Sequence, residues 1–204
     1  MAKRMQACTT CHGAQGITSN QAYFPRIAGK PVGYLFNQLQ NFKEGRRHYG
    51  LMVGMVEHLS DAYLLEMAQY FAGLDLPYAP PAPLKIPASA ATLQSGKTLA
   101  LQGDKDRKIA ACTSCHGTAL MGVLPSTPAL LGLPRDYLVA QLGAWQTGLR
   151  RAHAPDCMGR IAKVMTSNDI EAVSSWLATQ PVPTYAKAAA SLPQPQTEAC
   201  GGAK

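Results

Sequence analysis

The chain has 204 residues, 47% of them hydrophobic and 15% charged, with a formal net charge of +7. This composition is that of a globular protein and excludes an intrinsically disordered chain. Nucleic-acid binding is disfavoured, since the basic residues are spread thinly and no recognised nucleic-acid motif occurs. No apolar run approaches the roughly 20 residues of a membrane-spanning helix.

The elements predicted along the chain are helices, in two similar sets. Apolar residues recur at spacings of three and four over residues 32–43 and 61–72, and Ser60 is a typical N-cap for the second of these segments. The same pattern returns over 135–146 and 167–179. An alternating strand pattern does not occur at any length, so the sequence predicts an all-α fold.

An internal repeat determines the expected domain organisation. Residues 7–13 recur as residues 111–117 at an offset of 104, and further matches follow at offsets of 103 and 106. Between the repeats the chain is rich in proline, which cannot continue a helix and favours a semi-rigid linker. We therefore predict four segments: a first domain over 1–76, a linker over 77–90, a second domain over 91–180, and a Pro- and Gly-containing tail over 181–204.

Each repeat contains the sequence Cys-x-x-Cys-His, which is the attachment signature of haem c. Two thiols form thioethers with the vinyl groups of a porphyrin, and the adjacent histidine is the proximal ligand of the iron. A tetrathiolate zinc site would have to join two separate repeats, and a thioredoxin-like motif would need a βαβ context that is missing. The sequence therefore predicts two covalently bound haem c groups. Their binding residues are Cys8, Cys11 and His12 in the first repeat and Cys112, Cys115 and His116 in the second.

Methionine is the usual sixth ligand of a haem that transfers electrons. The first repeat offers Met52 and Met55, and the second offers Met158 and Met165. At the local offset of 106, Met52 and Met158 face each other, whereas Met55 and Met165 have no methionine in the other copy. We predict Met52 and Met158 as the axial iron ligands opposite the two histidines, and Met55 and Met165 as core side chains.

Several alternatives stay open for the iron ligands and for the remaining cysteines. His48 and His153 lie just upstream of the methionines and would give bis-histidine haems, unless they are simply solvated. Cys157 adjoins Met158, and its thiolate could replace that methionine on the second iron. Alternatively, Cys157 and Cys200 form a disulfide that ties the tail to the second domain, or both remain free thiols.

With these residues in place, the chain resembles the cytochrome c4 family of two-domain, two-haem electron carriers, over roughly residues 7–180. The resemblance implies two class I cytochrome c folds related by a pseudo-twofold axis, with the haems close together across the domain interface. It also implies that Met52, the first methionine of a Met-x-Gly-Met segment, binds iron. The segments that carry the resemblance are 24–29, 34–35, 38–39, 42–46, 52–55, 99–104 and 168–170.

The expected function is electron transfer without catalysis. We expect a respiratory donor, such as a quinol-oxidising complex or a dehydrogenase, and the resemblance implies a terminal oxidase, such as a haem-copper oxidase, as the acceptor; a reductase is the other acceptor we expect. Two other functions stay open. One is a cytochrome subunit of a dehydrogenase complex, and the other is a dihaem oxidoreductase with a Cys-ligated catalytic haem, similar to thiosulfate dehydrogenases.

Haem c is attached outside the cytoplasm in bacteria, so we expect a periplasmic protein whose export signal has been removed. Peripheral association with a membrane stays open. Basic residues would steer partners with acidic docking surfaces, an attraction that weakens with salt; otherwise they keep the surface soluble or hold haem propionates. They are Lys30, Lys43, Arg46 and Arg47 in the first half and Arg135, Arg150 and Arg151 in the second.

Overall fold

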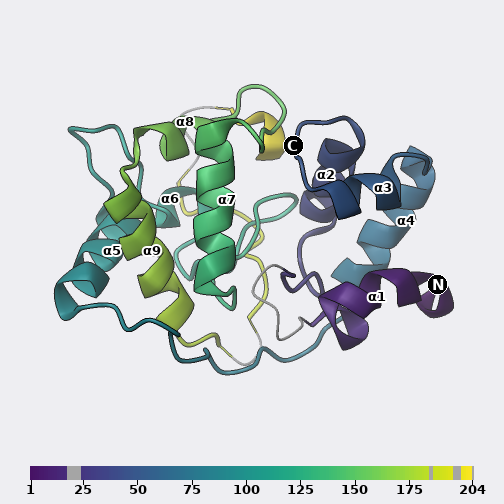
Figure 1. The fold of residues 1–204 in the computed structure, drawn as a ribbon, viewed down its shortest axis with the longest axis horizontal. Helices are drawn as coiled ribbons and strands as arrows, with labels where there is room; N and C mark the ends of the chain where they lie inside the picture. Colours follow the sequence, from purple (N-terminus) through teal and green to yellow (C-terminus); the bar gives the residue numbers. More distant parts are fainter. Residues whose placement is uncertain (18–23, 184–185, 195–198, 204) are drawn as a thin grey trace.

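The structure is a computed structural model that describes residues 1–17, 24–183, 186–194 and 199–203 (Figure 1). The α-helices of the first half are α1 (Gln6–His12), α2 (Val32–Lys43), α3 (Gly50–Val56) and α4 (Asp61–Ala72). The second half contains α5 (Ala90–Gln102), α6 (Thr113–His116), α7 (Arg135–Thr147), α8 (Cys157–Val164) and α9 (Ser167–Thr179). Short 3₁₀-helices cover Ala2–Met5 (η1), Ala14–Gly16 (η2) and Gly201–Ala203 (η3).

The all-α prediction is confirmed. Helices α2, α4 and α9 have the predicted bounds, and α7 ends one residue beyond the predicted segment. Within the described ranges there is no β-strand, and only isolated β-bridges join segments of the chain. None of the helices in this part of the chain has the length and hydrophobicity to span a bilayer.

The hydrophobic residues form two separate clusters, one in each half of the chain. The first cluster is built from α2, α3 and α4, and Met5 of η1 lies in it with only 1% of its surface exposed. The second cluster is built from α5, α7, α9 and the loop that follows α6. Figure 1 shows the halves next to each other, with purple to blue helices on one side and teal to green helices on the other. Each half therefore has its own core, as a separate domain requires.

Helices α5 and α9 make the closest helix contact in the second half. A Cβ atom added to Gly96 of α5 would lie 2.1 Å from the carbonyl oxygen of Ala172 in α9, so only glycine fits there. Each helix has a polar N-cap: Ser89 accepts from the amide of Thr92, and Thr166 forms a capping box with Asp169.

The proline-rich connection between α4 and α5 contacts both halves. The guanidinium of Arg26 donates to the carbonyls of Leu76 and Pro77 and lies over the ring of Tyr78 at 4.0 Å. Tyr78 packs in turn on the second cluster, against Gly132. The start of the connection, residues 76–78, thus contacts both halves, while the domain boundaries at residues 76, 90 and 180 stay predictions.

The two halves meet along segments that are equivalent in the repeat. Arg47 and Arg150, matched at the offset of 103, pair in an antiparallel β-bridge. Beside it the amide of His48 donates to Leu149 at 2.7 Å, and the amide of Arg151 donates to Arg46 at 2.6 Å. An antiparallel pairing of equivalent residues is what a twofold axis between two similar domains produces.

The tail turns back over the second half after α9. The amide of Ala189 donates to Gly122, and its carbonyl accepts from Leu124. Further on, Cys200 forms a disulfide with Cys157, the first residue of α8.

The end of the tail also contacts the first half. The amide of Gly201 donates to Pro155 at 3.0 Å, and the side-chain amide of Asn37 in α2 donates to the carbonyl of Gly202 at 3.3 Å. The tail thus joins the α8 region of one half to α2 of the other.

Candidate haem centres

The two motif histidines are held in the same way. His12 ends α1 and His116 ends α6, and both are buried. Each Nδ1 lies 2.8 Å from a backbone carbonyl, that of Pro25 for His12 and that of Pro128 for His116. A carbonyl only accepts, so each Nδ1 carries the proton and each Nε2 keeps its lone pair for a metal. Burial lowers the pKa of both imidazoles, which favours the neutral form that an iron ligand needs.

The four motif cysteines are partly buried and none is in a disulfide. Burial raises the pKa of Cys8, and it raises the pKa of Cys112 to about 11, so before haem attachment both thiols are protonated at neutral pH. Among the described residues no group of three or more His, Cys, Asp or Glu side chains could hold a metal ion. The pairs therefore do not form the shared zinc site, and each remains beside its own histidine, as thioether attachment to haem requires.

The predicted axial methionines occupy equivalent places. Met52 lies in the first turn of α3 and Met158 in the first turn of α8, and both are half-buried. Met165 is 7% exposed in the second core, as expected. The expectation for Met55 is wrong: it is 46% exposed, because Val56, the next residue of α3, fills the core position. Ligation of iron by Met52 and Met158 stays a prediction.

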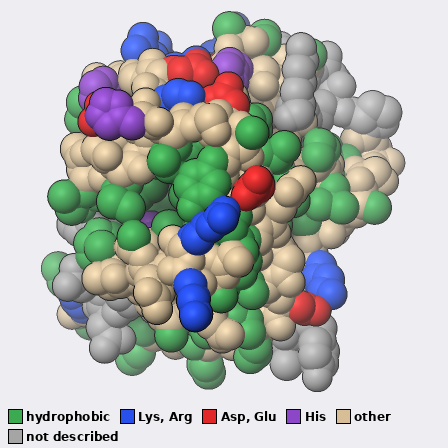
Figure 2. Space-filling view, turned by 90° about the vertical axis from the view of Figure 1, so that its right-hand side faces the viewer, with side chains coloured by type: hydrophobic (Ala, Val, Ile, Leu, Met, Phe, Trp, Pro, Cys, Tyr) green, Lys and Arg blue, Asp and Glu red, His purple; other side chains and the backbone are tan. Residues whose placement is uncertain are grey.

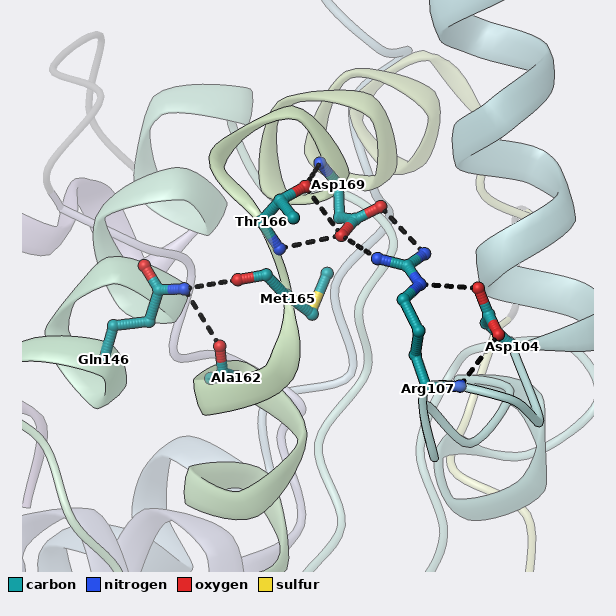
Figure 3. Close-up of polar contacts among 7 residues, drawn as sticks. All are labelled: Asp104, Arg107, Gln146, Ala162, Met165, Thr166 and Asp169. Carbon is teal, nitrogen blue, oxygen red and sulfur yellow. Dashed lines mark hydrogen bonds and ion pairs between the residues drawn. The ribbon is translucent and has the colours of Figure 1, made fainter.

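A polar network near Met165 fixes the C-terminal end of α8, the helix that carries Met158 (Figure 3). The side-chain amide of Gln146 in α7 donates to the carbonyls of Ala162 and Met165, at 3.0 and 2.7 Å, and so holds the end of α8. Sequence reasoning missed this contact because a glutamine in a helical pattern is normally assigned to the solvent face.

The loop before the second haem motif is tied to α9 in the same network. Arg107 donates to Asp104 at 2.6 Å and to Asp169 at 2.6 and 3.2 Å (Figure 3). Its side chain is 40% exposed, so water and salt screen these pairs and they add little to stability. Their effect is to keep the chain that leads into Cys112 against the core of the second half.

Two buried arginines lie together where the halves meet. Arg47 donates to Gln38 at 3.0 Å, Tyr137 at 3.1 Å and Gln141 at 2.6 Å, and Arg150 donates to the same glutamines at 3.0 and 2.9 Å. Arg47 is 9% exposed and Arg150 is 5% exposed. Among the described residues neither has a carboxylate partner, and burial lowers the pKa of Arg150.

A third buried cation, Lys30, has a backbone carbonyl as its hydrogen-bond partner. A buried charge without a counter-ion costs several kcal/mol. Haem propionates are carboxylates, and arginine binds carboxylates in two-pronged hydrogen bonds. The unpaired cations therefore fit a group that brings its own anions, which is a further property of haem.

The remaining basic residues of the expected docking set are mostly neutralised. Lys43 pairs with Asp61 at 2.8 Å. Arg46 pairs with Glu44, and Arg135 pairs with Asp136 and Glu171. Arg151 is exposed. The surface therefore offers fewer free cations to an acidic partner than the sequence suggested.

The alternative iron ligands are engaged elsewhere or point to solvent. His48 is exposed, and the Nε2 atom of His153 lies 3.0 Å from the guanidinium of Arg46. The Cys157–Cys200 disulfide confirms one of the alternatives left open for these cysteines. A disulfide sulfur is not a thiolate, so Cys157 is not available to replace Met158 on the iron.

Known proteins share this arrangement, although no family model matches the chain. A thiosulfate dehydrogenase electron acceptor of Thiomonas intermedia is 40% identical over 86% of this chain and 79% of its own. The protein of the same name in Stutzerimonas stutzeri is 41% identical over 84% of this chain and 78% of its own. Cytochrome c4 of Pseudomonas aeruginosa is 31% identical over 83% of this chain and 82% of its own.

Solved structures agree with these relatives. Cytochrome c4 from Pseudomonas stutzeri superposes with a TM-score of 0.71 at 31% identity, over 86% of this chain and 94% of its own. The thiosulfate dehydrogenase TsdBA from Marichromatium purpuratum superposes with a TM-score of 0.73 at 31% identity, over 85% of this chain. The chain spans 36% of the length of that protein.

The family relationship explains the site. Two tandem class I cytochrome c domains each carry one Cys-x-x-Cys-His motif, a motif histidine held by a backbone carbonyl, and buried cations at the interface. The protein is a dihaem cytochrome with two covalently bound haem c groups, and it takes part in electron transfer. This chain belongs to the cytochrome c4 family.

Proposed function

We propose that the protein is a periplasmic electron carrier that takes electrons from a thiosulfate-oxidising dehydrogenase and passes them to a terminal oxidase or reductase. The choice of electron donor is supported by sequence identities of 40% and 41% to two proteins named as thiosulfate dehydrogenase electron acceptors. The relatives named cytochrome c4 are 30–33% identical. The periplasm is the compartment that suits both covalent haem attachment and the disulfide.

The carrier function, as opposed to catalysis, is supported by Cys157. A Cys-ligated catalytic haem would need its thiolate, and the disulfide to Cys200 removes it. Each haem iron supplies a one-electron couple when bound. The protein's own part is to hold the histidines His12 and His116 in one orientation by hydrogen bonds to Pro25 and Pro128, so that ligand geometry changes little between oxidation states.

The face that the first half turns outward carries many apolar side chains. Hydrophobic side chains cover much of the face that this half turns outward, with scattered acidic and basic side chains among them (Figure 2). Around Met52, the exposed apolar residues of α3 and its N-cap are Tyr49, Leu51 and Met55, which are 39%, 64% and 46% exposed. Such residues suit brief contact with a redox partner.

The experiment is reduction of the oxidised holoprotein by thiosulfate in the presence of a purified thiosulfate dehydrogenase, followed by its haem absorbance. Rapid reduction of both haems that depends on the dehydrogenase supports the proposal. Reduction by thiosulfate alone would make the protein an enzyme. No reduction with an active dehydrogenase would assign the donor to another class. The same assay with cytochrome c4 of Pseudomonas aeruginosa serves as the comparison. It shows whether the dehydrogenase reduces this protein faster than a relative named cytochrome c4.

A further inference from the structure

Lys30 is a buried lysine of the first half that reaches into the second. It is 3% exposed, and its ammonium donates to the carbonyl of Ala129 at 3.3 Å. Ala129 follows Pro128, whose carbonyl accepts the Nδ1 proton of His116. The ammonium therefore lies one peptide unit from the group that orients the proximal ligand of the second haem.

The surroundings of Lys30 leave its charge uncompensated by protein. Its titratable and charged neighbours are Arg26 on the same segment and His116 across the interface. Burial, and to a lesser extent Arg26, lowers the pKa of Lys30 to about 7. The described residues contain no carboxylate paired with it.

The second half has no equivalent of this lysine. At the offset of 103, Lys30 corresponds to Leu133, whereas Arg47 corresponds to Arg150. The electrostatic effects on the two motif histidines differ in the same way. Besides burial, the charges of Lys30 and Arg150 lower the pKa of His116, while the charge of Arg47 lowers the pKa of His12. The interface thus has a symmetric pair of arginines and one lysine without a counterpart.

We propose that Lys30, although it belongs to the first half, raises the reduction potential of the second haem relative to the first. A reduced iron carries one positive charge less than an oxidised one, so a nearby ammonium favours reduction while it is protonated. Burial keeps water from screening the ammonium, which makes it more effective than a surface lysine.

This inference rests on the two haem c groups and not on the proposed donor, since no donor enters the test. The measurement is a redox titration of the holoprotein at about pH 6, below the pKa of Lys30, so that the ammonium is charged. Each haem is assigned by NMR contacts of its methyl groups. Lys30→Gln keeps a donor for Ala129 and removes the charge. We expect the reduction potential of the second haem to fall by ~59 mV. For a one-electron couple this is a tenfold change in the equilibrium constant for reduction. The first haem should move much less.

Three further variants separate charge from packing. Lys30→Met, which removes the hydrogen bond as well, should give the same downward shift as Lys30→Gln. Lys30→Arg should keep the native value. Lys97→Gln removes an exposed lysine of the second half and should shift neither haem. Unchanged potentials in Lys30→Gln, or equal shifts of both haems, would overturn the proposal.

A measurement on the native protein covers the case in which the variants do not accumulate as holoprotein. By thermodynamic reciprocity, a charge that favours reduction of the second haem must bind its proton more tightly once that haem is reduced. Nitrogen-15 NMR of the Lys30 ammonium should show a higher pKa in the reduced than in the oxidised protein. An equal pKa in both states would contradict the proposal.

Discussion

Arg47 and Arg150 show how one residue type serves a surface role or an interior one according to its partners. Their sequence context, in loops with other basic residues, suggested docking to an acidic protein. In the structure both are buried and share the acceptors Gln38 and Gln141. A signal for this was present, because Arg47 and Arg150 keep the offset of 103 that also relates the two glutamines. What sequence reasoning lacked was the contact between halves that buries them.

If these arginines compensate haem propionates, removing one leaves a buried carboxylate unpaired. We expect Arg47→Gln to lower the free energy of unfolding of the holoprotein by about 3 kcal/mol. Arg46→Gln, which removes a partly exposed neighbour paired with Glu44, should cost less than about 1 kcal/mol. Guanidinium unfolding followed by haem absorbance measures both, and equal costs would contradict the assignment of Arg47.

Ligation of the two irons by Met52 and Met158 can be tested by substitution. Met52→Leu and Met158→Leu should each remove half of the methionine-to-iron charge-transfer band of the oxidised protein, because each opens one iron. Met55→Leu and Met165→Leu serve as controls of matched chemistry and should leave the band intact. Loss of the band in Met55→Leu, with the band unchanged in Met52→Leu, would show that Met55, one helical turn further along α3, is the iron ligand.

At the scale of elements, the bounds of the helices could be predicted from the local sequence pattern, whereas the path of the chain between and after them could not. Helices α2 and α4 begin and end where the apolar periodicity and the Ser60 cap place them. The tail has no such pattern, and the path of its described residues depends on the disulfide, backbone hydrogen bonds and side-chain contacts such as that of Asn37. Sequence alone left the disulfide as one of several alternatives, because pairing of two cysteines separated by 43 residues depends on where the fold brings them.

The disulfide should add stability by restricting the unfolded chain. For a loop of 43 residues, chain entropy gives about 4 kcal/mol as the cost of replacing Cys157 and Cys200 together by alanine. Denaturation of the double variant measures the loss. Asn37→Ala, which breaks only the contact between α2 and the tail, should cost about 1 kcal/mol. If the double cysteine variant lost less stability than Asn37→Ala, the disulfide would not be the main link that holds the tail.

At the scale of the whole molecule, charge is distributed between interior and surface. Lys30, Arg26, Arg47 and Arg150 are buried, so they contribute to the net charge of +7 without offering a docking site. In the reduced protein, where each ferrous porphyrin core is neutral, the four propionates of two haems offset more than half of that net charge. The molecule presented to a partner is therefore less basic than its sequence.

The rate of electron transfer from the donor should accordingly depend weakly on salt. Strong steering by exposed charges would lower the association rate steeply with ionic strength. With Lys43 and Arg135 paired with acids, we expect less than about a tenfold fall in rate between low and physiological ionic strength. Stopped-flow mixing with the dehydrogenase over a salt series measures it, and a steeper fall would restore the acidic-partner hypothesis.

The pairing of Cys157 with Cys200 has a consequence for how the protein matures. Six cysteines must be sorted between two incompatible fates: four must stay reduced to form thioethers, and two must be oxidised. Cys200 follows the other five in the chain, so the correct disulfide can form only after all four haem thiols have emerged. A cell that makes this protein must therefore keep those thiols reduced, or reduce them again, before haem is attached, since a mispaired haem cysteine would leave a porphyrin vinyl group without its bond.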